Sequence, residues 1–198
     1  MIIKMKKNDK KFDQILVKYQ ENLTKTFQNL NKSSLRKAAL LLEKKIKANS
    51  KVFIAGNGGS AAVSNHFICD FLKNVKYLTN LKPKVISLSS NIEAIMAISN
   101  DLGYSKSLVH QAKSLADKDD IFVIISSSGN SKNIIELVKF AKNNNNKIIG
   151  MSAFSGGYLK NNSDIHIHVK IDDYGISEDI FQSIMHIFVK NICIKNKK

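Results

Sequence analysis

The sequence predicts an α/β fold, in which a three-layer, doubly wound parallel sheet carries helices on both faces and a helical extension precedes it. Three observations indicate this class. Five short apolar runs alternate with segments of helical periodicity, the first of these runs begins only at Lys51, and clusters of glycine or serine follow two of them. Strands that alternate with helices are typical of a parallel sheet, and such sheets bind ligands at the carboxyl ends of their strands.

The elements follow in order along the chain. Apolar residues three and four apart predict a helix over 12–29, and Ser33-Ser34 is the predicted start of a second helix with a stripe through Ile46. The predicted strands are the apolar runs at 51–55, 84–88, 120–125, 147–151 and 165–171. A closing helix is expected over 177–194. Since the two N-terminal helices have no strand of their own to cover, we expect them to pack against another subunit or across the sheet.

The composition is that of one ordinary globular domain. The chain has 198 residues, of which 43% are hydrophobic and 24% charged, and a disordered or fibrous protein does not fit these values. We assign the N-terminal helices to 1–50 and the sheet core to 51–198. No apolar run suits a membrane span or a secretion signal. Cys69 and Cys193 are too few for a disulfide framework, so we expect a reducing cytoplasm.

The net charge of +15 first suggests an anionic partner such as a nucleic acid. However, Arg36 is the sole arginine, and lysine lacks the planar fork that reads guanine edges and clamps phosphates. The lysines are also scattered along the chain. We therefore interpret the charge as a compositional bias and do not expect nucleic-acid binding, although the lysines could steer a phosphorylated substrate toward the protein.

A glycine-rich loop, Gly56-Asn57-Gly58-Gly59-Ser60, lies between the first predicted strand and a helix. Its glycines allow close backbone approach, and a helix N-terminus offers free N–H groups to an anion. Asn57, Gly58 and Ser60 are the candidate binding residues. A tight turn would need glycines even without a ligand. The loop has neither the dinucleotide-binding spacing nor a Walker sequence, so no nucleotide cofactor is expected.

A serine-rich loop follows the third predicted strand. It offers hydroxyl groups ahead of a helix that opens at about Lys132, and these belong to Ser126, Ser127, Ser128 and Ser131. Such a neutral donor cup suits a monoester phosphate. The alternative is that one serine caps the helix, but a cap needs only one such residue. Two donor loops at the ends of parallel strands predict one small phosphorylated ligand.

Two pairs of titratable residues have helical spacing. His66 and Asp70 are four apart on the helix after the first loop, and Glu178 and His186 are eight apart on the closing helix. Taken singly, each has an ordinary structural explanation as a core, surface or first-turn residue. His166 also alternates with His168 along the last predicted strand, where a partly exposed strand face explains both.

The segment G-N-G-G-S-A-A-x-x-x-H with the later S-S-S-G-N-S resembles the sugar isomerase (SIS) fold and, within it, the phosphoheptose isomerases. The resemblance extends through Ser89–Glu93, Ser99–Tyr104 and Gly156-Gly157 to the closing helix. It implies the conversion of sedoheptulose 7-phosphate to D-glycero-D-manno-heptose 7-phosphate by proton transfer through an enediol. It further implies a homotetramer that supplies heptose to a cell-surface glycan.

The resemblance also implies roles for individual residues. A metal site, often zinc with one ion per subunit, would use His66, Asp70, Glu178 and His186. Asp70 or Glu178 would take the carbon-bound proton, and His186 would act on the oxygens. Asp70 stands where the family usually has Glu, and Glu178 where it usually has Gln. The glycine and serine loops would hold the phosphate, while Asn91 and Asp101 match positions near the sugar hydroxyls.

Two other classes of protein remain open. One is a binding protein on the same fold, either a sugar-phosphate sensor or a relative that binds a replication initiator. The other is a nucleic-acid-binding protein, which rests on charge alone. The presence of the two His and two carboxylates favours an enzyme, because a pure binder needs the phosphate loops but no acid/base set.

Overall fold

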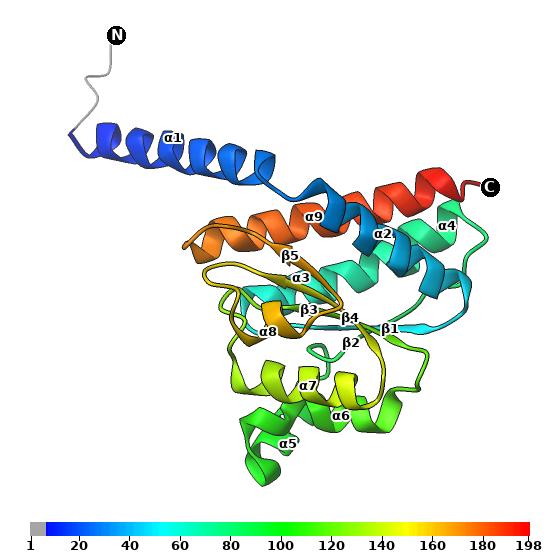
Figure 1. Ribbon diagram of the computed structural model, residues 1–198. Helices are drawn as coiled ribbons and strands as arrows, with labels where there is room; N and C mark the ends of the chain where they lie inside the picture. Colours follow the sequence, from blue (N-terminus) through cyan, green and yellow to red (C-terminus); the bar gives the residue numbers. More distant parts are fainter. Residues whose placement is uncertain (1–6) are drawn as a thin grey trace.

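The computed structural model of the chain describes residues 7–198 and confirms the predicted fold class (Figure 1). Residues 1–6, the start of the predicted N-terminal helical region, lie outside the described part. One parallel sheet has the strand order β2-β1-β3-β4-β5. Its members are β1 (Lys51–Ala55), β2 (Lys84–Ser87), β3 (Ile121–Ile125), β4 (Lys147–Ser152) and β5 (Ile165–His168). The order reverses between β1 and β3, which makes this the topological switch point where such folds bind ligands.

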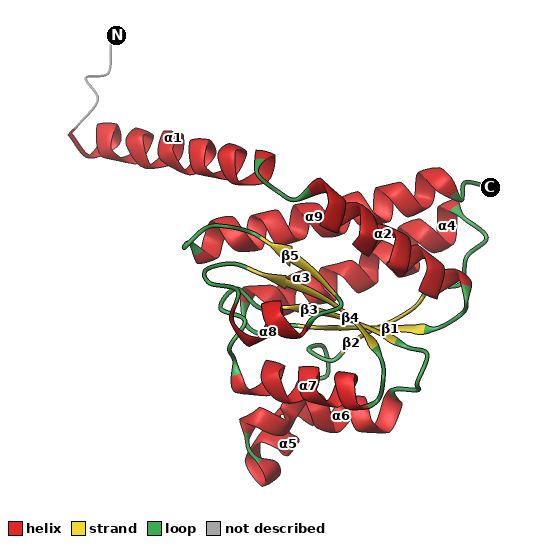
Figure 2. Ribbon diagram, in the orientation of Figure 1, coloured by secondary structure: helices red, strands yellow, loops and turns green. Residues whose placement is uncertain are grey.

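Helices cover both faces of the sheet (Figure 2). One layer consists of α2 (Lys32–Lys47), α3 (Gly59–Asp70) and α9 (Tyr174–Lys195). The other contains α5 (Ile92–Leu102), α6 (Ser107–Leu115), α7 (Lys132–Asn143) and the short α8 (Gly157–Asn162). The central strands β1, β3 and β4 are apolar and mostly buried, as a sheet between helices requires, and the sheet divides the core into two clusters. None of the residues of α5 is buried.

The N-terminal helix α1 (Lys7–Gln28) extends away from the sheet, as Figure 1 shows. Phe12, Ile15 and Leu16 on this helix are each more than half exposed, whereas Tyr19 and Leu23 pack against the core. Both N-terminal helices contact α9, and α2 also packs across the sheet on β1 and β5. The predicted packing of α1 on another subunit therefore stays a prediction, with an exposed apolar stripe that agrees with it.

Some boundaries differ from prediction because side chains cap the helices earlier than expected. Asn31, not the Ser33-Ser34 pair, caps α2, since its Oδ1 accepts a hydrogen bond from the Ser34 backbone N–H at 3.0 Å. Asp173 likewise caps α9, so that helix begins at Tyr174 rather than at 177. The last strand ends at His168 instead of 171, because the chain turns there.

A π-helical turn, η1 (Phe71–Val75), follows α3 directly and leads into the short α4 (Lys76–Leu78). Such turns are rare and occur frequently at functional sites. Among residues 7–198, none of the helices combines the length and the hydrophobicity that a bilayer crossing requires.

Candidate active site

The glycine-rich loop connects β1 to α3 at the switch point. Gly58 has φ +53°, a conformation that disfavours residues with a Cβ. The base of the loop is held by Ser89, whose Oγ accepts a hydrogen bond from the Gly56 N–H at 3.1 Å and donates to the Gly56 carbonyl at 2.7 Å. Ser60 in the first turn of α3 is buried, with 3% of its surface exposed. The loop thus presents the N-terminal end of α3 to the space above the sheet.

The serine-rich loop connects β3 to α7 on the other side of the switch point. The Ser126 hydroxyl accepts a hydrogen bond from the Gly129 N–H at 3.2 Å, and the Ser127 hydroxyl bonds to that of Ser177 at 3.0 Å. Ser131 occupies the cap position of α7, yet its side chain makes no capping hydrogen bond. Helix capping was the alternative explanation for the serines. It does not account for the hydroxyl group of Ser131.

The two loops and the start of α9 enclose one small cavity of about 120 Å³. Its lining consists of Asn57, Ser60, Ser126, Ser127, Ser128, Ser131, Tyr174 and Glu178. The structure thus brings six predicted phosphate-binding residues together with one predicted acid/base residue. Tyr174 is an addition that the sequence did not indicate. The hydroxyl groups and the N-termini of α3 and α7 make the cavity suitable for an anion.

Glu178 faces the N-terminus of α3 from the second turn of α9. A Cβ placed on Gly59 would clash with the Glu178 carboxyl group, so glycine at this position makes room for that group. Burial, with a smaller contribution from Asp179, raises the pKa of the Glu178 carboxyl group.

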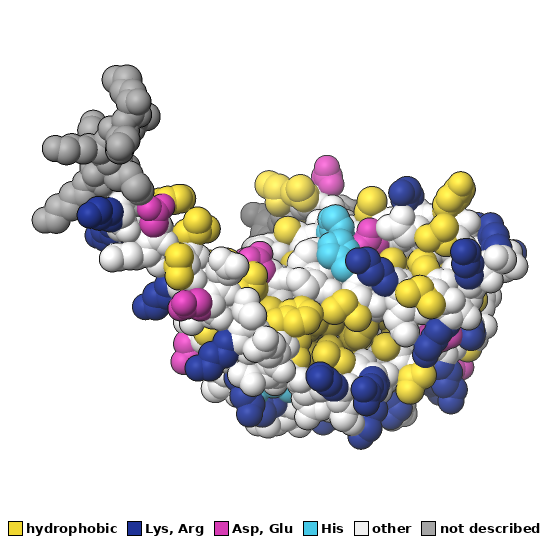
Figure 3. All heavy atoms as spheres, turned by 90° about the horizontal axis from the view of Figure 1, so that it is seen from above, with side chains coloured by type: hydrophobic (Ala, Val, Ile, Leu, Met, Phe, Trp, Pro, Cys, Tyr) yellow, Lys and Arg dark blue, Asp and Glu magenta, His cyan; other side chains and the backbone are white. Residues whose placement is uncertain are grey.

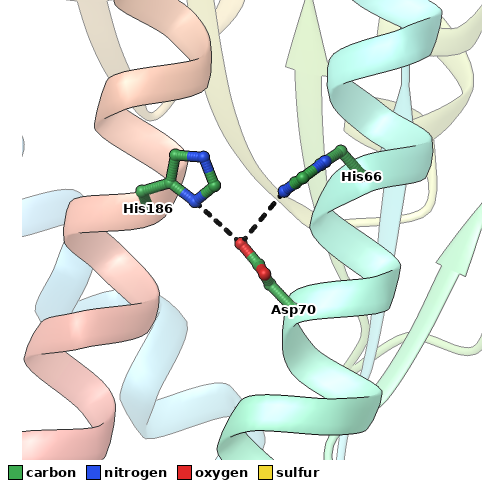
Figure 4. A group of neighbouring side chains, drawn as sticks. All are labelled: His66, Asp70 and His186. Atoms are coloured by element: carbon green, nitrogen blue, oxygen red, sulfur yellow. Dashed lines mark hydrogen bonds and ion pairs between the residues drawn. The ribbon is translucent and has the colours of Figure 1, made fainter.

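Three of the four predicted metal ligands converge between α3 and α9 (Figure 4). His66 Nε2 lies 3.6 Å from Asp70 Oδ2, and His186 Nδ1 lies 2.9 Å from the same oxygen. The two imidazole rings meet edge to face with centroids 5.0 Å apart. One ligand atom from each residue lies within 4.8 Å of the others.

The fourth predicted ligand, Glu178, is not part of this group. It precedes His186 by eight residues, or about 12 Å along the axis of α9 at 1.5 Å per residue. The helical spacing correctly predicts that both residues lie on one side of the helix. That spacing does not bring their side chains to one ion, because two helical turns separate them.

Two carboxamide side chains form hydrogen bonds with members of the His66-Asp70-His186 group. Asn74 in the π-helical turn donates from Nδ2 to Asp70 Oδ1 at 3.1 Å, and Gln182 Nε2 lies 3.0 Å from His186 Nε2. Neither residue is among the site residues predicted from the sequence. The available signal was spacing, since Asn74 lies four residues after Asp70 and Gln182 four before His186.

Comparisons with known proteins agree with this geometry. The SIS domain family model matches residues 17–153. A phosphoheptose isomerase from Helicobacter pylori (strain P12) is 32% identical over 169 residues, covering 85% of this chain and 87% of that protein. The chain belongs to the phosphoheptose isomerase family. One such enzyme from Aliarcobacter butzleri is 34% identical over 155 residues, covering 78% of this chain and 81% of that protein. The structure of a phosphoheptose isomerase from Francisella tularensis superposes with a TM-score of 0.83 at 26% identity, covering 96% of this chain and all of that one.

Within this phosphoheptose isomerase fold, two predicted sugar-binding residues lie outside the cavity. The Asn91 side chain caps α5, where its Oδ1 accepts from the Ala94 N–H at 2.9 Å. Asp101 accepts a hydrogen bond from Asn100 at the exposed end of the same helix. Neither Asn91 nor Asp101 lines the cavity of this single chain. Their contacts with a sugar therefore stay predictions.

The histidines of β5 have protein partners instead of a ligand group. His166 Nε2 lies 2.7 Å from the Ser152 hydroxyl, and His168 Nε2 lies 2.8 Å from the Phe154 carbonyl oxygen. Burial, with smaller contributions from His168 and Lys160, lowers the pKa of His166 to about 4. These contacts agree with the structural explanation of the pair.

Proposed function

We propose that this protein is a ketose–aldose isomerase that converts sedoheptulose 7-phosphate to D-glycero-D-manno-heptose 7-phosphate. The observation that carries the proposal is the combination of a hydroxyl-lined cavity at the switch point with a His-Asp-His group farther along α3 and α9. Membership of the phosphoheptose isomerase family supports the same reaction.

The phosphate end of the substrate occupies the hydroxyl-lined cavity. Ser60, Ser126, Ser128 and Ser131 supply neutral donors there, and the N-termini of α3 and α7 supply oriented backbone N–H groups. A neutral cup holds a phosphate monoester without an ion pair, so product release does not require two charges to separate.

The length of the substrate places the reacting carbons at the His-Asp-His group. Eight single bonds separate C1 of the ketose from the phosphorus, and an extended chain of this kind spans about 10 Å at ~1.2 Å per bond. Glu178 at the cavity and His186 are separated by about 12 Å along α9. An extended substrate therefore reaches from the cavity to the group formed by His66, Asp70 and His186.

The reaction needs one base at carbon and one proton shuttle at oxygen. Asp70 removes the proton from C1, which leaves the electron pair in the enediol double bond, and returns it to C2. His186 moves the hydroxyl proton from O1 to O2, so that O1 becomes the aldehyde oxygen and O2 becomes a hydroxyl group. Its Nδ1 lies 2.9 Å from Asp70 Oδ2, which places the two groups within reach of adjacent atoms. Glu178 lines the phosphate end, and burial raises the pKa of its carboxyl group, which reduces its repulsion of an anionic ligand.

A divalent metal such as zinc fits the donor set. Two imidazoles and a carboxylate are the ligands that catalytic zinc sites use, with the fourth position left for substrate or water. His66, Asp70 and His186 would hold the ion, one per subunit, and the metal would supply Lewis-acid stabilisation of the enediolate oxygens. Glu178 is left out of this ligand set.

We also propose a homotetramer in a reducing cytoplasm, acting in the supply of heptose for a cell-surface glycan. Exposed apolar residues on α1 support an assembly, and so does the groove between α2 and α9 lined by Leu35, Leu40 and Ile187. Figure 3 shows this apolar surface in the middle of the face, with histidine side chains beside it. The free Cys69 and buried Cys193 agree with a reducing compartment.

The deciding experiment incubates the purified protein with sedoheptulose 7-phosphate, with zinc or with a chelator, and follows aldose formation. We expect turnover that His186→Gln and Asp70→Asn each reduce strongly. A protein that binds the sugar phosphate without converting it would instead be a binding protein on the same fold.

A further inference from the structure

The two phosphate-binding loops are joined by a pair of asparagine side chains. Asn57 belongs to the loop after β1, and Asn133 lies in the first turn of α7, after the serine loop. Asn57 Nδ2 donates to Asn133 Oδ1 at 2.9 Å, and Asn133 Nδ2 donates to Asn57 Oδ1 at 2.8 Å. The two amides thus form a closed, reciprocal pair between segments 76 residues apart in the sequence.

A third side chain joins this pair. The hydroxyl of Tyr104, at the start of the 3-10 turn η2 (Tyr104–Lys106), donates to Asn57 Oδ1 at 2.9 Å. The same turn is fastened to α7, because Lys106 Nζ lies 2.6 Å from Glu136 Oε2. Asn133 is 1% exposed, so its amide is fixed inside the protein. We call Asn57, Asn133 and Tyr104 the amide brace.

The hydrogen bonds of the brace occupy most of the Asn57 side chain. A carboxamide has two acceptor lone pairs and two donor protons. Asn133 and Tyr104 donate to both lone pairs of Asn57 Oδ1, and one proton of Nδ2 is donated to Asn133. One N–H is left for a ligand in the adjacent cavity. Asn57 is therefore held in place mainly by protein groups.

The outer side of the glycine loop has little support of its own. A Cβ added at Gly58 would meet no atom within 4 Å, so the loop faces open space there. Ser89 holds the base of the loop through Gly56, and the brace holds its tip through Asn57. Because the opposite wall of the cavity belongs to the serine loop and α7, the brace sets the distance between the two walls.

We propose that Asn133 and Tyr104 are positioning residues for phosphate binding. They hold Asn57 so that the backbone amides of the glycine loop and the hydroxyls of the serine loop reach the same phosphate group. This inference rests on the proposed function, since it takes the ligand of the cavity to be a phosphate monoester. Neither residue needs to touch the phosphate.

The test is a double-mutant cycle on the full chain. Asn133→Leu, Asn57→Ala and their combination are compared in the dissociation constant for inorganic phosphate, measured by calorimetry. We expect each single variant to bind phosphate about tenfold more weakly, and the double variant no more weakly than the worse single one, because both remove the same pair. Asn143→Ala, at the exposed far end of α7, is the matched control and should bind like the wild type.

Kinetics separate positioning from a general structural effect. For sedoheptulose 7-phosphate, Asn133→Leu should raise KM about tenfold and change kcat less than about twofold, since a remote binding interaction is lost. A merely destabilised protein would lose active enzyme, and therefore kcat, with KM unchanged. Tyr104→Phe removes one exposed hydroxyl group and should raise KM and the phosphate dissociation constant about threefold.

Several results would overturn the proposal: multiplicative effects in the cycle, wild-type phosphate affinity in Asn133→Leu, or no phosphate binding by the wild type. If Asn133→Leu does not fold, Tyr104→Phe decides, and an unchanged dissociation constant contradicts the brace. The expected phosphate-binding pattern without turnover of sedoheptulose 7-phosphate would support the brace and refute the proposed isomerase activity.

Discussion

His186 Nδ1 lies 2.9 Å from Asp70 Oδ2, although 116 residues separate the two in the sequence. The contact joins the C-terminal end of α3 to the middle of α9, which pack side by side. It fixes the orientation of the imidazole ring against the carboxyl group of Asp70. Asp70 and His186 are therefore expected to act as a unit.

Loss of either member of this unit should affect the chemical step. We expect Asp70→Asn and His186→Gln each to lower kcat by at least ~100-fold, because general acid–base catalysis typically contributes 10²–10⁴-fold. KM should change little, since the phosphate cavity is untouched. Steady-state kinetics with sedoheptulose 7-phosphate measure both constants. His110→Gln, on the exposed side of α6, is the control, and an equal loss in that variant would argue against the assignment.

Gln182 should affect metal binding through His186. Its amide lies 3.0 Å from His186 Nε2, the ring atom that faces away from Asp70. Residues that orient a metal-ligating histidine typically contribute about 10–100-fold to metal affinity. Gln182→Leu should therefore weaken zinc binding at least ~10-fold in a competition titration with a chromophoric chelator. Ser183→Ala, the next residue on α9, should bind zinc like the wild type, and equal affinity in both variants would contradict this role.

The raised pKa of Glu178 predicts that the stability of the protein depends on pH. Its pKa is raised by burial and by Asp179, so the folded protein binds the proton more tightly than the unfolded chain does. Stability from this group is greatest at pH values below its unfolded pKa and falls as the pH rises through its folded pKa. Glu178→Gln should thus raise Tm at pH 8 and have a smaller effect near pH 4, as followed by circular dichroism. Glu21→Gln on the exposed side of α1 is the control.

Glu178→Gln also tests whether the charge of this carboxyl group affects phosphate binding in the cavity. Replacing the Glu178 carboxyl group with a carboxamide should tighten binding of inorganic phosphate more at pH 8 than near pH 4, because the ionised fraction of a carboxyl group, and with it the repulsion of the anion, rises with pH. A loss of kcat with unchanged phosphate affinity would instead assign Glu178 to the chemical step, as the base that takes the carbon-bound proton.

The apolar stripe of α1 should carry an assembly contact. Phe12, Ile15 and Leu16 are 65%, 58% and 57% exposed on a helix that extends away from the sheet. Replacing Ile15 and Leu16 together with Asp should convert the expected tetramer into smaller species, as measured by sedimentation velocity. Lys11→Asp with Lys18→Asp changes the charge on the same helix without removing apolar surface. A wild-type monomer would contradict the prediction.

The local elements were largely predictable because periodicity and glycine or serine clusters report on them directly. The strand β3 is apolar and fully buried, and the two loops at the switch point stand out by composition. The boundary errors lie at the starts of α2 and α9, which Asn31 and Asp173 cap earlier than expected, and at the end of β5. A capping side chain is one of several polar residues near a boundary, and the sequence does not show which of them reaches the backbone.

The sequence by itself determined the fold class, the two donor loops and the residue types available for proton transfer. Only the tertiary structure decided which of these residues lie together. Glu178 lines the phosphate cavity, while His66 and Asp70 meet His186, which lies about 12 Å from Glu178 along the axis of α9. Only the structure also reveals that the amide of Asn57 pairs with Asn133. The physical reason is that spacing on one helix fixes direction and height along that helix, whereas side-chain contact depends on which other element packs opposite.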